Sequence, residues 1–98
     1  MPAYVIAEVE ITNPEGYKEY GAMVPATITQ YGGRFLARGG KSQALEGEWP
    51  ERRRVIIEFP SVEAARKWWD SPEYAKPKAL RRANSNGRLI LIEGVAPG

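Results

Sequence analysis

An alternating stretch near the start of the chain decides the fold: Tyr4-Val5-Ile6-Ala7-Glu8-Val9-Glu10-Ile11. Val5, Ala7, Val9 and Ile11 fall on one side of it, and the residues between them form a second, mixed side. Because side chains of a strand alternate between its two faces, this pattern predicts a β-strand with one apolar face and one partly polar face.

A helix is predicted directly after this strand. Asn13 is a favourable N-cap residue, and Pro14 suits the first helical position. Gly32-Gly33 ends the helix, and Pro25 lies inside it, where we expect it to kink the helix or split it into two pieces. Residues at helical spacing mark its buried face: Tyr17, Tyr20, Val24, Thr27, Ile28 and Tyr31.

The rest of the chain divides into three strands and a second helix. We expect the strands at residues 34–38, 54–59 and 88–95. The helix begins at Ser61, restarts at Ser71-Pro72 and ends near Ala83. Residues 41–53 form a polar loop, and residues 84–87 form a turn.

The resulting order, β-α-β-β-α-β, predicts a ferredoxin-like α+β fold with a four-stranded antiparallel sheet and two helices on one face. A chain of 98 residues fits one domain, residues 1–98. The other face of the sheet would carry Ile6, Leu36, Ile56, Glu8, Glu10, Arg38, Arg54 and Glu58. Such a face is too apolar to leave in water and too charged for a plain core. We therefore expect a homodimer, in which a second copy of the sheet covers this face and encloses a partly polar cavity.

The composition excludes several kinds of site. The chain has no cysteine and no histidine, which excludes disulfides, thiolate and zinc sites, Ser-His-Asp triads and His-ligated haem. We expect neither a metal nor a cofactor. No apolar run approaches the roughly 20 residues of a membrane span. The N-terminus also lacks the pattern of a secretory signal, so we expect a cytoplasmic protein with no membrane partner.

The net charge of +2 conceals an uneven distribution. Residues 1–51 carry 4 basic and 7 acidic side chains, whereas residues 52–98 carry 10 basic and 5 acidic ones. The basic half is either a solvated helix face or an anion-attracting rim around a binding site. The strand at 54–59 lacks the glycine and exposed aromatic residues of an RNA-recognition motif, so we expect no nucleic-acid partner.

Three groups of side chains could carry function, and each has a structural alternative. The mixed-charge set on the open sheet face, including Arg54, would be either an ion-pair network or the source of a carboxylate with a raised pKa. Tyr20, Trp69 and Tyr74 fit core packing, although a tyrosine hydroxyl in a pocket can orient a carbonyl or donate a proton. Arg81 either offsets the dipole of a helix C-terminus or anchors a carboxylate or phosphate.

An ordered series of motifs spans nearly the whole chain. It comprises Tyr31-Gly32-Gly33-Arg34-Phe35-Leu36-Ala37-Arg38-Gly39-Gly40, Leu45-Glu46-Gly47-Glu48-Trp49-Pro50, Val55-Ile56-Ile57-Glu58-Phe59-Pro60-Ser61, Trp68-Trp69, Ser71-Pro72-Glu73-Tyr74 and Leu80-Arg81. Together these motifs resemble the bacterial family called Domain of Unknown Function 1330. That family commonly has Trp-Tyr before Ser-Pro, and the missing hydroxyl here argues against proton transfer at position 69.

The resemblance implies a dimeric α/β-barrel fold. Its superfamily includes cofactor-independent oxygenases, isomerases, haem enzymes and proteins of unknown role, so the resemblance implies no particular activity. By matching positions it points to Tyr20, Arg38, Glu46, Trp69, Tyr74 and Arg81. The glycines at positions 33, 39 and 47 match as backbone requirements.

Two main hypotheses follow. In the first, the protein is a small homodimeric, cofactor-independent enzyme acting on a small anionic or carbonyl-bearing molecule, with glutamate as base and arginine anchoring charge. In the second, it is a ligand-binding or accessory module with the same pocket and no turnover, and a purely structural dimer is a third alternative. The catalytic candidates are Glu46 and Tyr20, and the ligand-binding candidates are Arg38, Arg54, Trp69, Tyr74 and Arg81.

Overall fold

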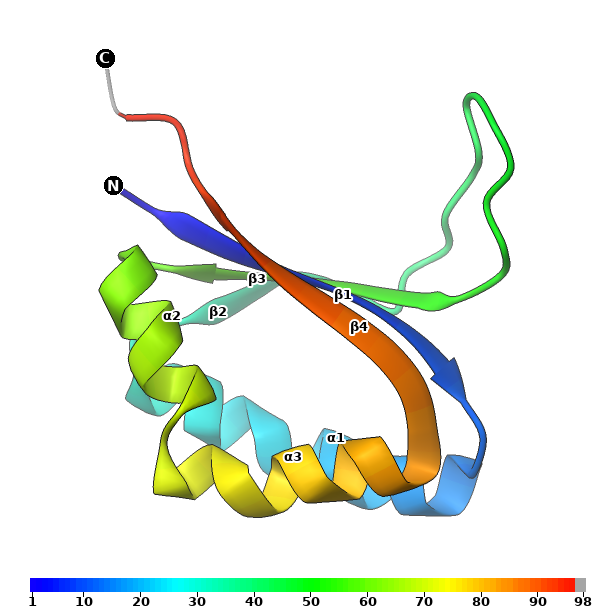
Figure 1. Cartoon of the computed structure of the whole chain (residues 1–98), viewed down its shortest axis with the longest axis horizontal. Helices are drawn as coiled ribbons and strands as arrows, with labels where there is room; N and C mark the ends of the chain where they lie inside the picture. Colours follow the sequence, from blue (N-terminus) through cyan, green and yellow to red (C-terminus); the bar gives the residue numbers. More distant parts are fainter. Residues whose placement is uncertain (97–98) are drawn as a thin grey trace.

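The computed structural model describes residues 1–96 and contains a four-stranded antiparallel sheet and three helices (Figure 1). In chain order the elements are β1 (Ala3–Ile11), α1 (Pro14–Gln30), β2 (Arg34–Arg38), β3 (Arg53–Phe59), α2 (Val62–Trp69), α3 (Pro72–Asn84) and β4 (Ser85–Glu93). Across the sheet the strands lie in the order β2-β3-β1-β4. The predicted order of elements is confirmed, with the second predicted helix present as two, α2 and α3.

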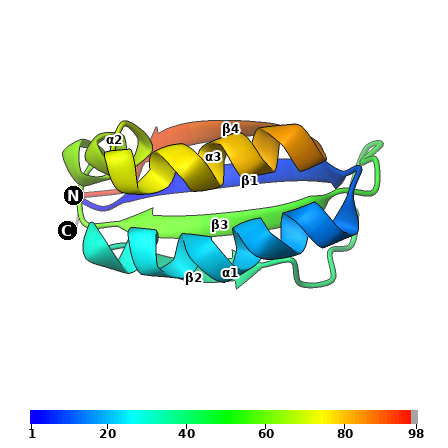
Figure 2. The same ribbon diagram turned by 90° about the horizontal axis from the view of Figure 1, so that it is seen from below.

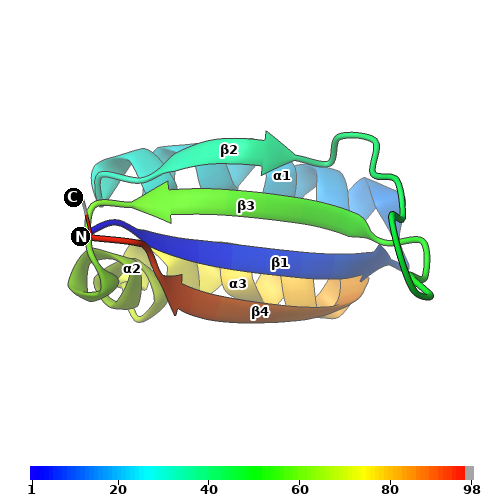
Figure 3. The same ribbon diagram turned by 90° about the horizontal axis from the view of Figure 1, so that it is seen from above.

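All three helices lie on one face of the sheet. Figure 2 shows α1 and α3 side by side along the strands, with α2 at the end where the chain begins. Figure 3 shows the opposite face, which no helix covers. The largest fully buried side chains lie between the two layers and include Trp68, Tyr74, Phe59 and Ile28. This core accounts for the apolar alternation of the strands, because their inward residues pack against the helices.

Serine caps explain why α2 and α3 are separate. The Ser61 hydroxyl accepts a hydrogen bond from the main-chain N–H of Ala64 at 3.0 Å. The Ser71 hydroxyl accepts one from the main-chain N–H of Tyr74 at 3.1 Å. Each bond satisfies an N–H in the first turn of a helix, and Pro72 follows the second cap at a position where proline is favoured.

Helix α1 continues through Pro25, so of the two expected effects, a kink or a split, the split does not occur. Proline has no N–H to donate to the carbonyl of Gly21, four residues earlier. The guanidinium of Arg38 donates to that carbonyl instead, with 2.6 Å between Nη2 and the oxygen. A side chain from the sheet thus satisfies the acceptor that the proline leaves free.

The turn expected at residues 84–87 is also wrong. Helix α3 extends to Asn84, and β4 begins at the next residue, Ser85. The Asn84 amide donates to the carbonyl of Leu80 at 2.8 Å, and the Ser85 hydroxyl donates to the carbonyl of Arg81. Since β1 pairs with β4 along its whole length, strand pairing replaces the turn that the local residues favour.

A one-residue shift in the pairing of β2 with β3 changes the position of Arg38. Phe35 pairs with Ile57, but Arg38 pairs with Val55, whose side chain is buried under the helices. In an unshifted ladder Arg38 would lie opposite Arg54, on the open face. The predicted place of Arg38 on the open face is therefore wrong, because the bulge turns it toward the helices.

The open face carries the predicted mixture of apolar and charged side chains. Ile90 and Ile92 are 64% and 52% exposed. The Glu8 carboxylate lies between two arginines, 3.7 Å from Nε of Arg54 and 3.1 Å from Nη2 of Arg88. Since these residues are cross-strand neighbours, the three charges form ion pairs across the open face of the sheet.

The connection between β2 and β3, residues 39–52, is called the arm here. It projects away from the sheet on the side opposite the helices (Figure 1). Its apolar side chains Leu45 and Trp49 are exposed. None of the helices within residues 1–96 has the length and apolar character needed to cross a membrane.

Candidate functional site

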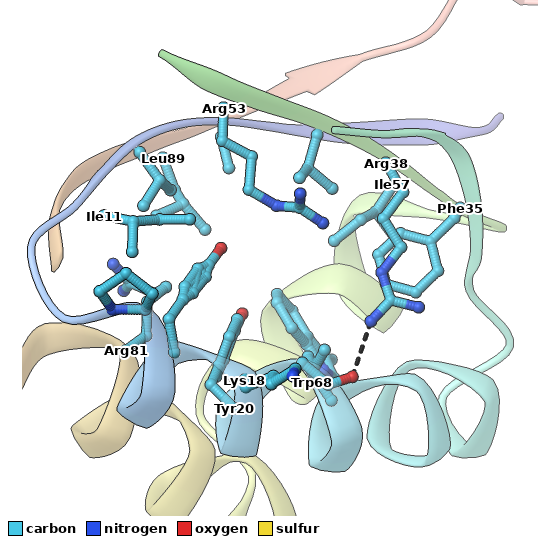
Figure 4. Close-up of a pocket in the computed structure, with 17 residues that line it drawn as sticks. Ile11, Lys18, Tyr20, Phe35, Arg38, Arg53, Ile57, Trp68, Arg81 and Leu89 are labelled. Atoms are coloured by element: carbon cyan, nitrogen blue, oxygen red, sulfur yellow. Dashed lines mark hydrogen bonds between the residues drawn. The ribbon is translucent and has the colours of Figure 1, made fainter. Parts of the chain in front are cut away.

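A cavity of about 360 Å³ lies between α1 and the sheet (Figure 4). Strands β1 and β4 contribute apolar side chains to it, as does Trp68 of α2. Its other walls come from α1, β2, β3 and α3. The volume lies within the range of roughly 300–1,000 Å³ that is typical of small-molecule sites.

Every charged side chain that lines this cavity is a cation. The four are Lys18, Arg38, Arg53 and Arg81, and the lining residues include no aspartate or glutamate. Figure 4 shows Arg38 and Arg53 reaching from the sheet toward α1. The cavity therefore combines apolar walls with an excess of positive charge, and this combination favours an anionic ligand.

Arg81 is the most deeply buried of these cations, with 4% of its surface exposed. Its Nε is buried and has no hydrogen-bond partner. Within residues 1–96 no carboxylate oxygen lies within 4.0 Å of its guanidinium. Arg81 lies in the last turn of α3, where the negative end of the helix dipole offsets only part of its positive charge. Arg81 is thus a buried cation that lacks a full counter-charge.

Tyr17 and Tyr20 line the cavity with Arg81, and Tyr74 is hydrogen-bonded to Tyr20. The hydroxyls of Tyr20 and Tyr74 are hydrogen-bonded at 3.1 Å, and the Tyr17 and Tyr20 rings meet edge to face at a centroid distance of 5.3 Å. Burial raises the pKa of Tyr20 far above its ordinary value of 10.0, and Tyr74 raises it further. Burial also raises the pKa of Tyr17, against the opposing effect of Arg53. Both hydroxyls that line the cavity are therefore protonated at neutral pH and available as donors.

The positions of Arg38 and Arg53 are fixed by their neighbours. The Arg38 guanidinium lies 4.6 Å from the centre of the Phe35 ring and donates to the Gly21 carbonyl, as Figure 4 shows. The Arg53 guanidinium lies 5.8 Å from the centre of the Tyr17 ring. A Cβ at Gly39 would come within 2.2 Å of Nη1 of Arg53. Glycine at this position leaves the room that the guanidinium occupies.

Three of the predicted site residues come together in this cavity: Tyr20, Arg38 and Arg81. Tyr74 lies behind them, completely buried, and reaches the cavity only through its hydrogen bond to Tyr20. Trp69 is half-buried outside the cavity, where the Lys78 ammonium lies 4.1 Å from the centre of its ring.

The other two predicted residues, Glu46 and Arg54, meet in a different place. Both line a hollow of about 500 Å³ between the arm and the sheet. The Arg54 guanidinium donates to the carbonyl of Pro50 at 2.7 Å and to the hydroxyl of Ser42 at 3.1 Å. Glu46 is exposed, and its main-chain carbonyl accepts a hydrogen bond from Nε1 of Trp49 at 2.8 Å. The structure does not bring Glu46 to the cavity of Arg81.

Tyr17 and Arg53 line the cavity but were not among the predicted site residues. Tyr17 precedes Tyr20 by three positions, so helical spacing places both on one face, a signal that could have identified it. Arg53 precedes Val55 by two positions and shares its face of β3. It was missed because the strand was expected to begin one residue later.

No cluster of three or more acidic residues suited to binding a metal ion occurs in the described part of the chain. The hydrogen-bond donors and cations that line the cavity suit an anion. Any cofactor in the cavity would have to be held by these same groups.

Comparisons with known proteins agree with this architecture. A family model described as "Domain of unknown function (DUF1330)" matches residues 2–95. No curated protein matches the chain significantly. Among solved structures, RPA0582 from Rhodopseudomonas palustris, a protein of unknown function, is 25% identical. The TM-score is 0.78, with 98% of this chain and 84% of that chain covered.

Two more distant structures share the fold. SnoaB, a cofactor-independent oxygenase from Streptomyces nogalater, is 14% identical with a TM-score of 0.66, covering 98% of this chain and 95% of that chain. A dimeric ferredoxin-like protein of unknown function from Jannaschia sp. CCS1 is 11% identical with a TM-score of 0.72. This match covers 96% of this chain and 100% of that chain. The ferredoxin-like α+β fold is confirmed by these likenesses.

Proposed function

The chain belongs to the DUF1330 family, whose description names no activity, and we propose its function from the cavity itself. The protein binds a small organic anion with a largely apolar body between α1 and the sheet. The charged end of the ligand lies at Arg81, and the body lies against the apolar walls.

The observation that carries this proposal is the burial of Arg81 without a carboxylate partner. A buried charge is costly unless it is paired and hydrogen-bonded. The unsatisfied Nε marks where a hydrogen bond is missing. An anionic ligand would supply both the counter-charge and the acceptor, which gives this arrangement a functional reason.

A second candidate function is cofactor-independent catalysis on the bound anion. Tyr17, Tyr20 and the cations offer donors but no carboxylate base. Such a lining stabilises negative charge that develops on a substrate, which is a common source of rate enhancement. SnoaB, a cofactor-independent oxygenase, has the same fold, which makes oxygen consumption worth measuring. Within one chain Glu46 lies outside this cavity, so we propose Tyr20 as a donor and assign no base.

We also propose that the protein is a homodimer joined through the open sheet face. Ile90 and Ile92 expose apolar surface there, between acidic and basic side chains that a second copy could match. The Jannaschia protein of this fold is described as dimeric.

The binding proposal is tested by calorimetric titration with benzoate and with benzyl alcohol, its neutral counterpart. We expect benzoate to bind and benzyl alcohol to bind more weakly. Arg81→Met should weaken benzoate binding by roughly 10- to 150-fold, which corresponds to the loss of a charged hydrogen bond. Arg82→Met, which removes an exposed arginine beside it, is the matched control and should leave the affinity unchanged.

The stability of the same variants separates a binding role from a structural one. If Arg81 serves a ligand, Arg81→Met removes an unpaired buried charge, so the free protein should be at least as stable as the wild type. Marked destabilisation of Arg81→Met, together with unchanged benzoate binding, would reject the proposed function. Incubation of bound ligands under air, with analysis of products, then tests the catalytic candidate.

A further inference from the structure

The hydrogen-bond donors of the cavity come from several side chains on different elements. Arg38 already donates to the Gly21 carbonyl and stacks on Phe35. The Arg53 guanidinium packs against Gly39 and faces the Tyr17 ring. Arg38 and Arg53 are thus held by other contacts, which leaves the buried Nε–H of Arg81 as a donor without a partner.

The donors beside Arg81 suit an anion whose charge lies on one oxygen. Nε of Arg81 is a buried donor without a partner, and Tyr17 and Tyr20 line the same cavity. Arg81 is near enough for its charge to act on both tyrosines. An oxygen anion accepts two or three hydrogen bonds, and each bond from a cation or an acidic hydroxyl favours its charged form.

Tyr74 strengthens the donor at Tyr20. Tyr74 is completely buried, and its hydroxyl bonds that of Tyr20 at 3.1 Å. When Tyr20 donates to a ligand, Tyr74 can donate to Tyr20 in turn, and a chain of hydrogen bonds is mutually reinforcing. The raised pKa values of Tyr17 and Tyr20 mean that these groups keep their protons while the ligand loses its own.

We propose, on the basis of the proposed anion site, that its ligands are weak organic acids, phenols or enols, which the cavity binds as their conjugate bases. The ligand O–H bond breaks, the proton passes to solvent water, and the electron pair stays on the oxygen. The aromatic walls formed by Phe35 and Trp68, together with aliphatic side chains, receive the conjugated body.

All charged groups that face this ligand favour its ionised form. Lys18 comes from α1, Arg38 from β2, Arg53 from β3 and Arg81 from α3. The residues that β1, β4 and α2 place in the lining are apolar. Because the lining holds four cations and no carboxylate, the bound ligand should be a stronger acid than the free one.

The test uses 4-nitrophenol, which absorbs visible light as its phenolate. Its absorbance is titrated against pH, free and bound to the wild-type protein. We expect the bound probe to have a pKa at least about one unit lower, which means that the phenolate binds about 10-fold or more tightly than the phenol. An unshifted or raised pKa of the bound probe would overturn the inference.

Variants locate the effect, and the wild-type titration stands even if one of them fails to fold. Tyr20→Phe should reduce the shift while leaving the binding of neutral 4-nitroanisole unchanged, and Arg82→Met should leave the shift intact. A full shift in Tyr20→Phe and in Arg81→Met would contradict the assignment to this cavity. If benzoate binds through Arg81 while 4-nitrophenol shows no shift, only this inference fails. If neither compound binds, the proposed function fails as well.

Discussion

Arg38 donates a hydrogen bond to the carbonyl of Gly21, the helical acceptor that Pro25 leaves free. This bond joins the edge strand β2 to helix α1 across the cavity (Figure 4). The β-bulge in β2 makes the bond possible, because it turns Arg38 toward the helices. The bulge in β2 thus supplies, through Arg38, the hydrogen bond that Pro25 removes from helix α1.

The compensation can be measured with a double-mutant cycle. Arg38→Met should lower the free energy of unfolding by about 1 kcal/mol in the wild type, since it leaves the Gly21 carbonyl without a protein donor. In a Pro25→Ala background the helix regains its own N–H, so the same substitution should cost less. Urea denaturation of the four proteins gives the coupling. Equal costs of Arg38→Met in both backgrounds would contradict the account.

Two adjacent glycines provide a matched test of the space around Arg53. Gly39 has a φ of +67°, and a Cβ there would come within 2.2 Å of Nη1 of Arg53. Gly39→Ala should lower the free energy of unfolding by about 1–2 kcal/mol because alanine is strained at this φ. It should also weaken benzoate binding, because Arg53 must move away from the new Cβ. A Cβ at Gly40 meets no atom within 4 Å, so Gly40→Ala is the control. If Gly39→Ala and Gly40→Ala had similar effects on the free energy of unfolding and on benzoate binding, glycine at position 39 would not be needed to leave room for Arg53.

The tyrosines of the cavity predict a loss of stability at alkaline pH. Burial raises the pKa of Tyr17 and Tyr20 above 10.0, so the folded state keeps protons that the unfolded state releases. Stability from these groups is therefore complete below about pH 9 and falls above pH 10, by up to about 1.4 kcal/mol per pH unit for each group. Urea denaturation between about pH 8 and 11 should show a shallower fall for Tyr20→Phe. An identical slope in wild type and variant would contradict the prediction.

The open sheet face predicts a dimer that one charge can disrupt. Ile90→Asp places a carboxylate in the exposed apolar patch of β4 and should yield monomers in sedimentation experiments at micromolar concentration. Ala26→Glu, on the exposed side of α1, adds a charge on the helix layer and should leave the dimer intact. Dimers that survive Ile90→Asp, or a wild-type monomer, would exclude this face as the interface.

The element order could be predicted because its signals are local. The alternation of β1 and the serine caps at Ser61 and Ser71 each depend on residues that are close together in the sequence. The position of Arg38 could not be predicted in this way, since a bulge depends on the pairing of two strands. The expected turn at residues 84–87 was wrong for a similar reason, because β1 extends the pairing of β4 through it.

The candidate site could be predicted only in part. Arg81 was considered as an anion anchor because of its chemistry, but its burial depends on the packing of α3 against the sheet. Arg54 and Glu46 were grouped with it by charge and by family resemblance, whereas the topology places them on the open face and the arm. The apolar walls of the cavity come from separate strands, and no short stretch of sequence reveals that they surround one space.

The most direct test of the central claim observes Arg81 itself. The side-chain Nε–H of arginine gives a signal in nitrogen–proton correlation spectra, and Arg81→Lys identifies the signal by its absence. With saturating benzoate, we predict that the Arg81 signal shifts and becomes protected from exchange. The signal of Arg54, whose Nε is also buried without a hydrogen-bond partner, should not move. An unchanged Arg81 signal, or a shift confined to Arg54, would contradict an anion site at Arg81.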